Sequence, residues 1–175
     1  MAHEHQRSDR NTYVRYDCTK LADFSSVIAR AREDDPSLTS TELCTDIQLA
    51  KKYGFSGMSY MQVYSYEDHN GYTVNPATPY DVESIMHYDS YNMGGEKCQK
   101  GDQAQCPLGV YRDPFIHDKG FEMIYARIKP TPWDVAWVKA QYPWTGAASG
   151  DMDSVEGDLE QLLDQAREDY VKNQV

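Results

Sequence analysis

Apolar residues recur at helical spacing near the start of the chain. Between Lys20 and Glu33 they return every three or four positions, which is the spacing of one face of an α-helix. These apolar positions are Leu21, Phe24, Val27, Ile28 and Ala31. We expect a helix over residues 20–33 with this face turned inward.

A second helix is predicted by its end signals as much as by its pattern. Thr39 is followed three residues later by Glu42, which is the spacing of a capping box. Gly54 is suited to end a helix because it adopts left-handed backbone angles without strain. We expect a helix over residues 40–53 with Leu43, Ile47 and Ala50 inward, and Cys44 on or beside the buried face.

The third predicted helix lies near residue 131. Thr131 stands at the N-cap, Pro132 at the first helical position and Asp134 at the third. The helix should run to about Tyr142, where Pro143 stops it.

Two other segments lack the helical spacing or differ in composition. Residues 57–80 are rich in Gly, Asn, Pro and Ser, and we expect loops there with at most a short strand. Beyond Trp144 an acidic linker leads to a narrow apolar stripe at Leu159, Leu162, Leu163, Ala166 and Tyr170. We therefore divide the chain into a domain over residues 1–144 and an acidic linker with an amphipathic helical tail over residues 145–175.

Composition narrows the class of protein. The 175 residues suit one ordinary domain with appendages. A formal charge of -11 repels phosphate backbones, so we expect no nucleic-acid partner. The sequence has no apolar run near the roughly 18 residues that a membrane span needs, so we expect no membrane partner. The charged first ten residues predict no secretory signal within this chain.

The four cysteines are Cys18, Cys44, Cys98 and Cys106, and none forms a C-x-x-C pair. This argues against a zinc ribbon or a thioredoxin-type site. Cys98 and Cys106 flank a short polar loop that suits a tight reversal, which leaves Cys18 with Cys44. Such disulfides would contribute roughly 2.6 and roughly 3.6 kcal/mol in the chain-entropy model. Three connectivities are formally open, and four reduced cytosolic thiols are the alternative.

The five histidines do not by themselves define a catalytic site. They are His3, His5, His69, His87 and His117. His3 and His5 are two positions apart, so they cannot ligate one metal as an i, i+4 helical pair does. The sequence holds no H-E-x-x-H, no G-x-S-x-G and no phosphate-binding glycine loop.

Two separated segments, read together, suggest a family. HEHQRSDRNTYV at residues 3–14 and YDVESIMHYDSY at residues 80–91 resemble astacin-family zinc metalloendopeptidases. That family carries H-E-x-x-H-x-x-G-x-x-H-E-x-x-R-x-D-R and then the S-x-M-H-Y segment of a Met turn. The matching residues are His3, Glu4, Arg7, Asp9 and Arg10, then Ser84, Met86, His87 and Tyr88. PTPWDVAWVKAQYPW looks like the closing helix of the family, so the resemblance covers about residues 1–144.

The resemblance implies a role for each matching residue. His3 is the third zinc ligand, and Tyr88 is the switchable tyrosine that approaches the zinc and donates a hydrogen bond to the developing oxyanion. Met86 is an apolar floor beneath the metal. Glu4 in the family meets the amino terminus of the activated enzyme, a partner that this chain does not supply.

The remaining polar residues have simpler interpretations. Arg7, Asp9 and Arg10 are expected to form a local ion-pair network that holds the turn after the zinc segment. His5, together with His69 and His117, is expected to be an ordinary core or surface histidine.

The first two zinc histidines and the catalytic glutamate of the family motif would stand about ten to six residues before His3. We expect that the chain begins inside this motif. A complete domain would hold one zinc ion, whereas this chain alone should neither retain zinc nor cleave peptides. The resemblance implies an α+β fold, namely a metzincin-like C-terminal lobe dominated by helix and irregular loops with little strand.

The leading hypothesis is a zinc-dependent metalloendopeptidase that hydrolyses peptide bonds in proteins. The resemblance also implies a secreted protein whose cysteines form the two disulfides above. The alternative is a non-catalytic peptide- or protein-binding module derived from the same lobe. A third hypothesis places the function in the acidic tail helix.

Overall fold

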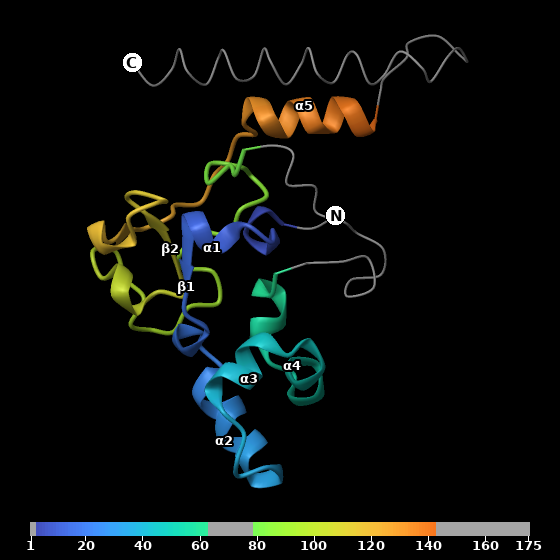
Figure 1. The fold of residues 1–175 in the computed structure, drawn as a ribbon, viewed down its shortest axis with the longest axis vertical. Coiled ribbons are helices and arrows are strands. Elements are labelled where there is room, and N and C mark those ends of the chain that lie inside the picture. The colour runs from blue at the N-terminus through green and yellow to red at the C-terminus, as the bar shows by residue number, and fades with distance from the viewer. Residues whose placement is uncertain (1–2, 63–78, 143–175) are drawn as a thin grey trace. The chain divides into compact units, whose positions relative to one another are not determined.

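The computed structural model describes residues 3–62 and 79–142, and these combine helices with a small antiparallel sheet (Figure 1). Helices predominate, so the α+β class is confirmed. The predicted tail over residues 145–175 lies outside the described residues. Within the described ranges, no helix combines the length and the apolar composition that crossing a bilayer requires.

The chain divides into two compact units, which we describe separately. The first holds the residues up to Val82 together with His87–Ala126, and the second holds Glu83–Met86 and the residues from Arg127 onward. The sheet and the first four α-helices belong to the first unit, and α5 belongs to the second.

Among the described residues, the sheet has three short strands in the order β1-β2-β3, with β2 in the centre. The strands are β1 (Val14–Tyr16), β2 (Leu108–Tyr111) and β3 (Phe121–Glu122). Both pairings are antiparallel, with Tyr16 opposite Leu108 and Val110 opposite Glu122. The strand β1 is therefore an edge strand of the described sheet.

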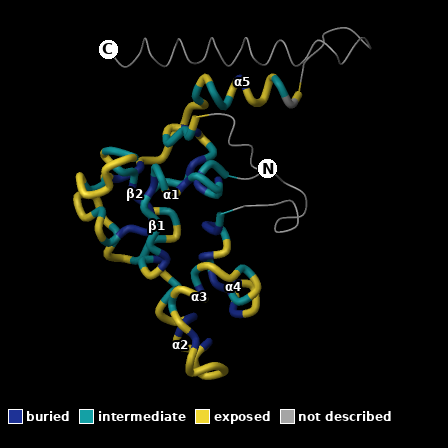
Figure 2. Tube along the Cα trace, viewed as in Figure 1, coloured by how far each residue is buried: buried dark blue, intermediate teal, exposed yellow. Residues whose placement is uncertain are grey.

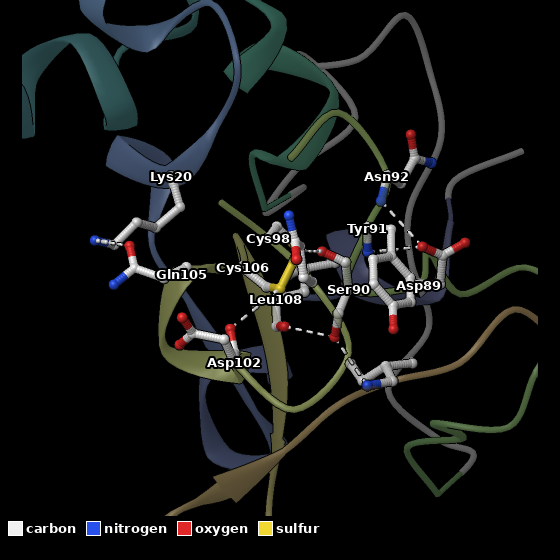
Figure 3. Close-up of a disulfide and its surroundings, with 12 residues drawn as sticks. Lys20, Asp89, Ser90, Tyr91, Asn92, Cys98, Asp102, Gln105, Cys106 and Leu108 are labelled. Carbon is white, nitrogen blue, oxygen red and sulfur yellow. Dashed lines mark hydrogen bonds between the residues drawn. A yellow bond between two sulfur atoms is a disulfide. The ribbon is translucent and has the colours of Figure 1, made fainter. Parts of the chain in front are cut away.

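A buried serine extends the sheet beyond its regular pairs. Ser90 is fully buried, and its hydroxyl donates to Leu108 O at 2.7 Å and accepts from Ile124 N at 2.8 Å. Figure 3 shows Ser90 beside the Cys98–Cys106 disulfide, with its hydroxyl turned to Leu108. The Ser90 hydroxyl thus bridges the main chains of Leu108 and Ile124.

The first predicted helix begins later than expected. The helix α2 spans Phe24–Asp34, and the short 3-10 turn η2 (Cys18–Lys20) precedes it. Leu21 is nevertheless buried between the two elements. The predicted inward face of α2 is correct, since Val27, Ile28 and Ala31 are all buried.

The predicted single helix over residues 40–53 is wrong, because the structure has two helices there. They are α3 (Ser40–Thr45) and α4 (Ile47–Tyr53), with Asp46 in extended conformation between them. The Asp46 carboxylate accepts from the main-chain N–H groups of Gln48 and Leu49 at 2.7 and 3.1 Å, so it caps a new helix. The capping box at the start of α3 and the left-handed Gly54 at the end of α4 are confirmed.

The helix α5 spans Pro132–Gln141 and agrees with the prediction. Thr131 Oγ1 accepts from Asp134 N at 3.2 Å, and the Asp134 carboxylate accepts in return from Thr131 N at 2.8 Å. The short helix α1, in the first unit, spans Arg10–Tyr13.

The disulfides join Cys18 to Cys44 and Cys98 to Cys106, which are the predicted pairs, and no cysteine is free. The first bridge ties the segment after β1 to α3. Figure 2 colours buried positions dark blue, and the buried hydrophobic residues of the first unit form one core. Its largest fully buried side chains include Tyr60, Phe55 and Leu43.

Candidate functional site

His3 and Tyr88 are distant in sequence but in contact in the first unit. Their ring centroids lie 4.6 Å apart. His3 immediately precedes the 3-10 turn η1 (Glu4–Gln6), and its main-chain N–H donates to Gln6 Oε1 at 2.9 Å. The structure therefore brings together the two residues to which the resemblance assigns zinc binding and oxyanion stabilisation.

His5 packs against both of these rings. Its ring stacks on Tyr88 with centroids 4.1 Å apart and lies 5.3 Å from the His3 ring. His5 Nε2 lies 3.1 Å from Ser59 O, and His5 Nδ1 lies 3.3 Å from Tyr88 N. Because a carbonyl only accepts and a main-chain N–H only donates, Nε2 carries the proton and Nδ1 is the acceptor.

Burial fixes the charge of His5 as well as its tautomer. The side chain is fully buried, and loss of hydration lowers its pKa to about 2, with His87 adding to the effect. Both ring nitrogens are occupied by the protein. His5 is accordingly a neutral core histidine, as the sequence predicted.

His87 is also held at both ring nitrogens. Nδ1 donates to Tyr88 O at 2.7 Å, and Nε2 accepts from the Tyr80 hydroxyl at 2.8 Å. Burial raises the pKa of Tyr80 well above its usual value, so its hydroxyl keeps its proton. The Tyr80 ring stacks on Tyr13 with centroids 4.8 Å apart.

Arg7 organises the turn that follows His3. It pairs with Glu4 at 2.9 Å and binds both carboxylate oxygens of Asp9, at 2.9 and 2.7 Å. Glu4 also accepts from Asp81 N at 2.9 Å. Desolvation of the Glu4 carboxylate outweighs these contacts and raises its pKa to about 7.

Arg10 holds the same turn through carbonyl oxygens. Its Nη1 donates to His5 O at 3.2 Å and to Tyr60 O in a short hydrogen bond. Its guanidinium carbon lies 4.8 Å from the centroid of the Tyr16 ring. The predicted network thus has an ionic part at Arg7 and Asp9, and a part at Arg10 that binds the main chain.

Met86 and Ser84 belong to the second unit. Met86 N donates to Ser84 Oγ at 3.0 Å, and Ser84 Oγ donates to the Asp134 carboxylate at 2.5 Å. These contacts tie residues 84–86 to the first turn of α5. The role of Met86 as a floor beneath a metal stays a prediction.

The remaining histidines are His117 and His69. His117 is exposed, stacks on Tyr111 with ring centroids 3.7 Å apart and lies 3.1 Å from Thr12 O. His69 lies outside the described residues. Tyr60 and Tyr80, which do pack around the site, were not singled out in the sequence, where only the abundance of tyrosine hinted at them.

In residues 3–62 and 79–142, no three His, Cys, Asp or Glu side chains come together in a group that could hold a metal ion. His3 is the imidazole that the resemblance assigns to zinc. The His5 ring, 5.3 Å from it, uses both of its nitrogens in hydrogen bonds.

Comparison with known protein families, with curated proteins and with solved structures found no match.

Proposed function

We propose that this chain supplies part of an astacin-type zinc metalloendopeptidase site. His3 would be one zinc ligand, and Tyr88 would donate a hydrogen bond to the carbonyl oxygen of the scissile peptide. The contact between these two rings, at 4.6 Å, carries the proposal. A ligand and an oxyanion donor must lie near the same reacting atoms, and this contact meets that requirement.

The residues present fit zinc only in part. A catalytic zinc site needs about three protein ligands, and His3 provides one. The H-E-x-x-H segment that would provide two more, with the catalytic base, does not occur in the sequence. Zinc in a complete site would acidify a bound water and polarise the carbonyl. We infer that these 175 residues alone neither hold zinc tightly nor hydrolyse peptides.

The chain's own residues would position Tyr88. Its main-chain N–H donates to His5, its carbonyl oxygen accepts from His87, and its ring stacks on His5. These three contacts restrain the main chain and the plane of the ring. The phenol hydroxyl at the tip can then serve as a donor at little cost in reorganisation.

The coding sequence immediately upstream of the Met1 codon gives the first test. An in-frame H-E-x-x-H-x-x-G there supports the peptidase, and a promoter with no such reading frame contradicts it.

A chain extended by that motif gives the biochemical test. We expect His3→Ala to abolish zinc retention after dialysis, because His3 would be a ground-state ligand. Tyr88→Phe should keep zinc and lower kcat far more than it raises KM, because its hydroxyl would act in the transition state. Tyr91→Phe, at an exposed tyrosine, is the control. Equal zinc loss in the His3 and Tyr88 variants would contradict the assignment of Tyr88.

The second candidate function is a non-catalytic module that binds peptides or proteins. It is favoured by the sequence itself, which lacks H-E-x-x-H, because residues without that segment can still hold an extended peptide. Chelator-sensitive proteolysis by the extended chain would exclude this candidate, and peptide binding without cleavage would support it.

A further inference from the structure

The helix α5 carries apolar residues on two different sides. On one side Ala136 is buried and Ala140, one turn later, is half-buried. Three further apolar residues, Val135, Val138 and Tyr142, remain 39, 49 and 67 % exposed. A surface helix usually has one apolar side and one polar side. The exposed apolar residues of α5 therefore call for a second partner.

These three residues form one face. Their spacing is i, i+3 and i+7, which places them in one row along a helix, and Tyr142 directly follows the last residue of α5. At about 100° per residue, this row lies roughly opposite Ala136. We call Val135, Val138 and Tyr142 the open face of α5. A contiguous exposed apolar patch of this kind commonly marks an interaction surface.

The same chain contains a segment that fits the open face. It continues for 33 residues beyond Tyr142, and within them apolar residues recur at helical spacing. They are Leu159, Leu162, Leu163, Ala166 and Tyr170. A lone helix of about a dozen residues is only marginally stable in water, so this stripe requires an apolar surface to pack on.

The lengths are compatible in either direction of packing. The stripe from Leu159 to Tyr170 would be roughly 17 Å long as a helix, and the ten residues of α5 span roughly 15 Å. Residues 143–158 lie between them and can reach roughly 53 Å when extended, so they can lead the chain back to either end of α5. A tether of this kind keeps the local concentration of the segment near about 1 mM, so a modest apolar contact suffices.

Charge also favours this occupant. Residues 145–175 contain eight acidic and two basic residues, which gives a net charge of -6. Lys139 stands beside the open face, four residues after Val135, and it is exposed. In the part of the chain that the structure describes, Lys139 forms no ion pair. An acidic helix laid on the open face can therefore pair with it.

We propose that residues 159–170 form a helix that packs on the open face of α5 in the same chain. The occupant of this surface is then the acidic tail itself, and a second copy of the chain is the competing occupant. The proposal does not involve His3 or Tyr88, so it holds or fails separately from the peptidase proposal.

A pair of introduced cysteines tests the contact in the whole chain. The native cysteines are all in disulfides, so Val138→Cys with Leu162→Cys supplies the only free thiols. Val138 is central in the open face and Leu162 lies near the middle of the stripe, so the two meet whether the helices run parallel or antiparallel. Mild oxidation should form a disulfide within one chain, identified by peptide mapping without reduction.

The matched control is Val138→Cys with Gln161→Cys. Its tether is one residue shorter, but Gln161 lies about 100° from Leu162 around the helix, on the side away from the stripe. We expect the Leu162 pair to oxidise roughly tenfold faster than the Gln161 pair, at a rate independent of protein concentration.

Hydrogen exchange gives a second measurement that needs no new thiols. Replacing Leu159, Leu162 and Leu163 together by glutamine should speed exchange of the α5 amides roughly tenfold, because the packing partner of the helix is lost. Replacing Gln161 and Gln165 by alanine leaves the stripe intact and should not speed it.

The proposal is overturned by equal oxidation rates for the two cysteine pairs, because a tail without a preferred face would give that result. Disulfides formed mainly between two chains would also overturn it and assign the open face to a second copy. Unchanged exchange of α5 in the triple glutamine variant would overturn it as well.

Discussion

Acid should destabilise this protein through His5. The buried ring has a pKa of about 2, whereas an unfolded histidine has a pKa of about 6.5. The unfolded chain therefore takes up a proton below about pH 6.5 that the folded chain does not, and stability falls as the pH falls. One pKa unit corresponds to about 1.36 kcal/mol, so lowering the pH to about 5 should cost about 2 kcal/mol through His5.

Glu4 acts in the opposite direction over the same pH range. Its pKa is raised to about 7, so the folded state favours the protonated carboxyl. The protonated Glu4 carboxyl contributes to the free energy of unfolding. This contribution is fully present below the unfolded pKa of about 4.5 and is lost as the pH rises toward about 7. The two contributions oppose each other between about pH 4.5 and about pH 6.5, so the wild-type profile alone cannot isolate His5.

His5→Gln separates the two effects. Glutamine offers one acceptor and one donor group, as the neutral ring does, but does not titrate. The assay is urea unfolding of wild type and variant, followed by far-ultraviolet circular dichroism at about pH 7.5 and about pH 5. At the higher pH, we expect the wild type to be more stable than His5→Gln. The difference between their free energies of unfolding should shrink by about 2 kcal/mol at the lower pH.

His117→Gln, at an exposed histidine, is the control for replacing an imidazole by an amide. If the difference in unfolding free energy between wild type and His5→Gln is the same at both pH values within about 0.5 kcal/mol, the reasoning is refuted.

Ser90→Ala should lower the free energy of unfolding by about 2 to 4 kcal/mol, because it leaves two buried main-chain groups without their partner. Ser26→Ala, at an exposed site of α2, is the control and should change stability by less than about 0.5 kcal/mol. Chemical denaturation measures both, and a small loss for Ser90→Ala would show that the two groups find other partners. Replacing Cys18 and Cys44 together by serine should cost about 3.6 kcal/mol. Peptide mapping without reduction tests the disulfide itself, and a bridge from Cys18 to any other cysteine would contradict the structure.

Helix ends could be predicted from the sequence where the capping residues lie within a few positions of one another. The Thr131, Pro132 and Asp134 signals located α5, because a capping box lies within four consecutive residues. Asp46 was missed because the apolar spacing of Leu43, Ile47 and Ala50 continues through it. Its carboxylate binds two N–H groups of the next turn, and a short acidic side chain can break a helix in this way without disturbing the apolar pattern.

The strands were not predictable in the same way. The strand β1 has three residues and β3 has two, which is too short for alternation to be recognised. Their partners are also remote in sequence, since Val14 pairs with Val110. Strand pairing at this range depends on the tertiary fold.

The site was predictable only through the resemblance of two motifs. Composition and spacing gave no reason to bring His3 near Tyr88, because nothing local links them. The packing that holds them includes Tyr60 and Tyr80, which stand in segments without periodicity. Their roles depend on contacts with residues distant in sequence, so a single sequence could not identify them.

His5 connects the stability of the fold to the geometry of the site. It lies two residues after His3, it accepts from the main chain of Tyr88, and it donates to Ser59, which lies in the 3-10 turn η3 (Ser56–Tyr60). Protonation of the ring would place a second N–H opposite the Tyr88 N–H, so that two donors would face each other. The contact that restrains Tyr88 beside His3 would then be lost together with the folding energy. Unfolding that lets His5 take up a proton should therefore also separate His3 from Tyr88, because one ring serves both the fold and the site.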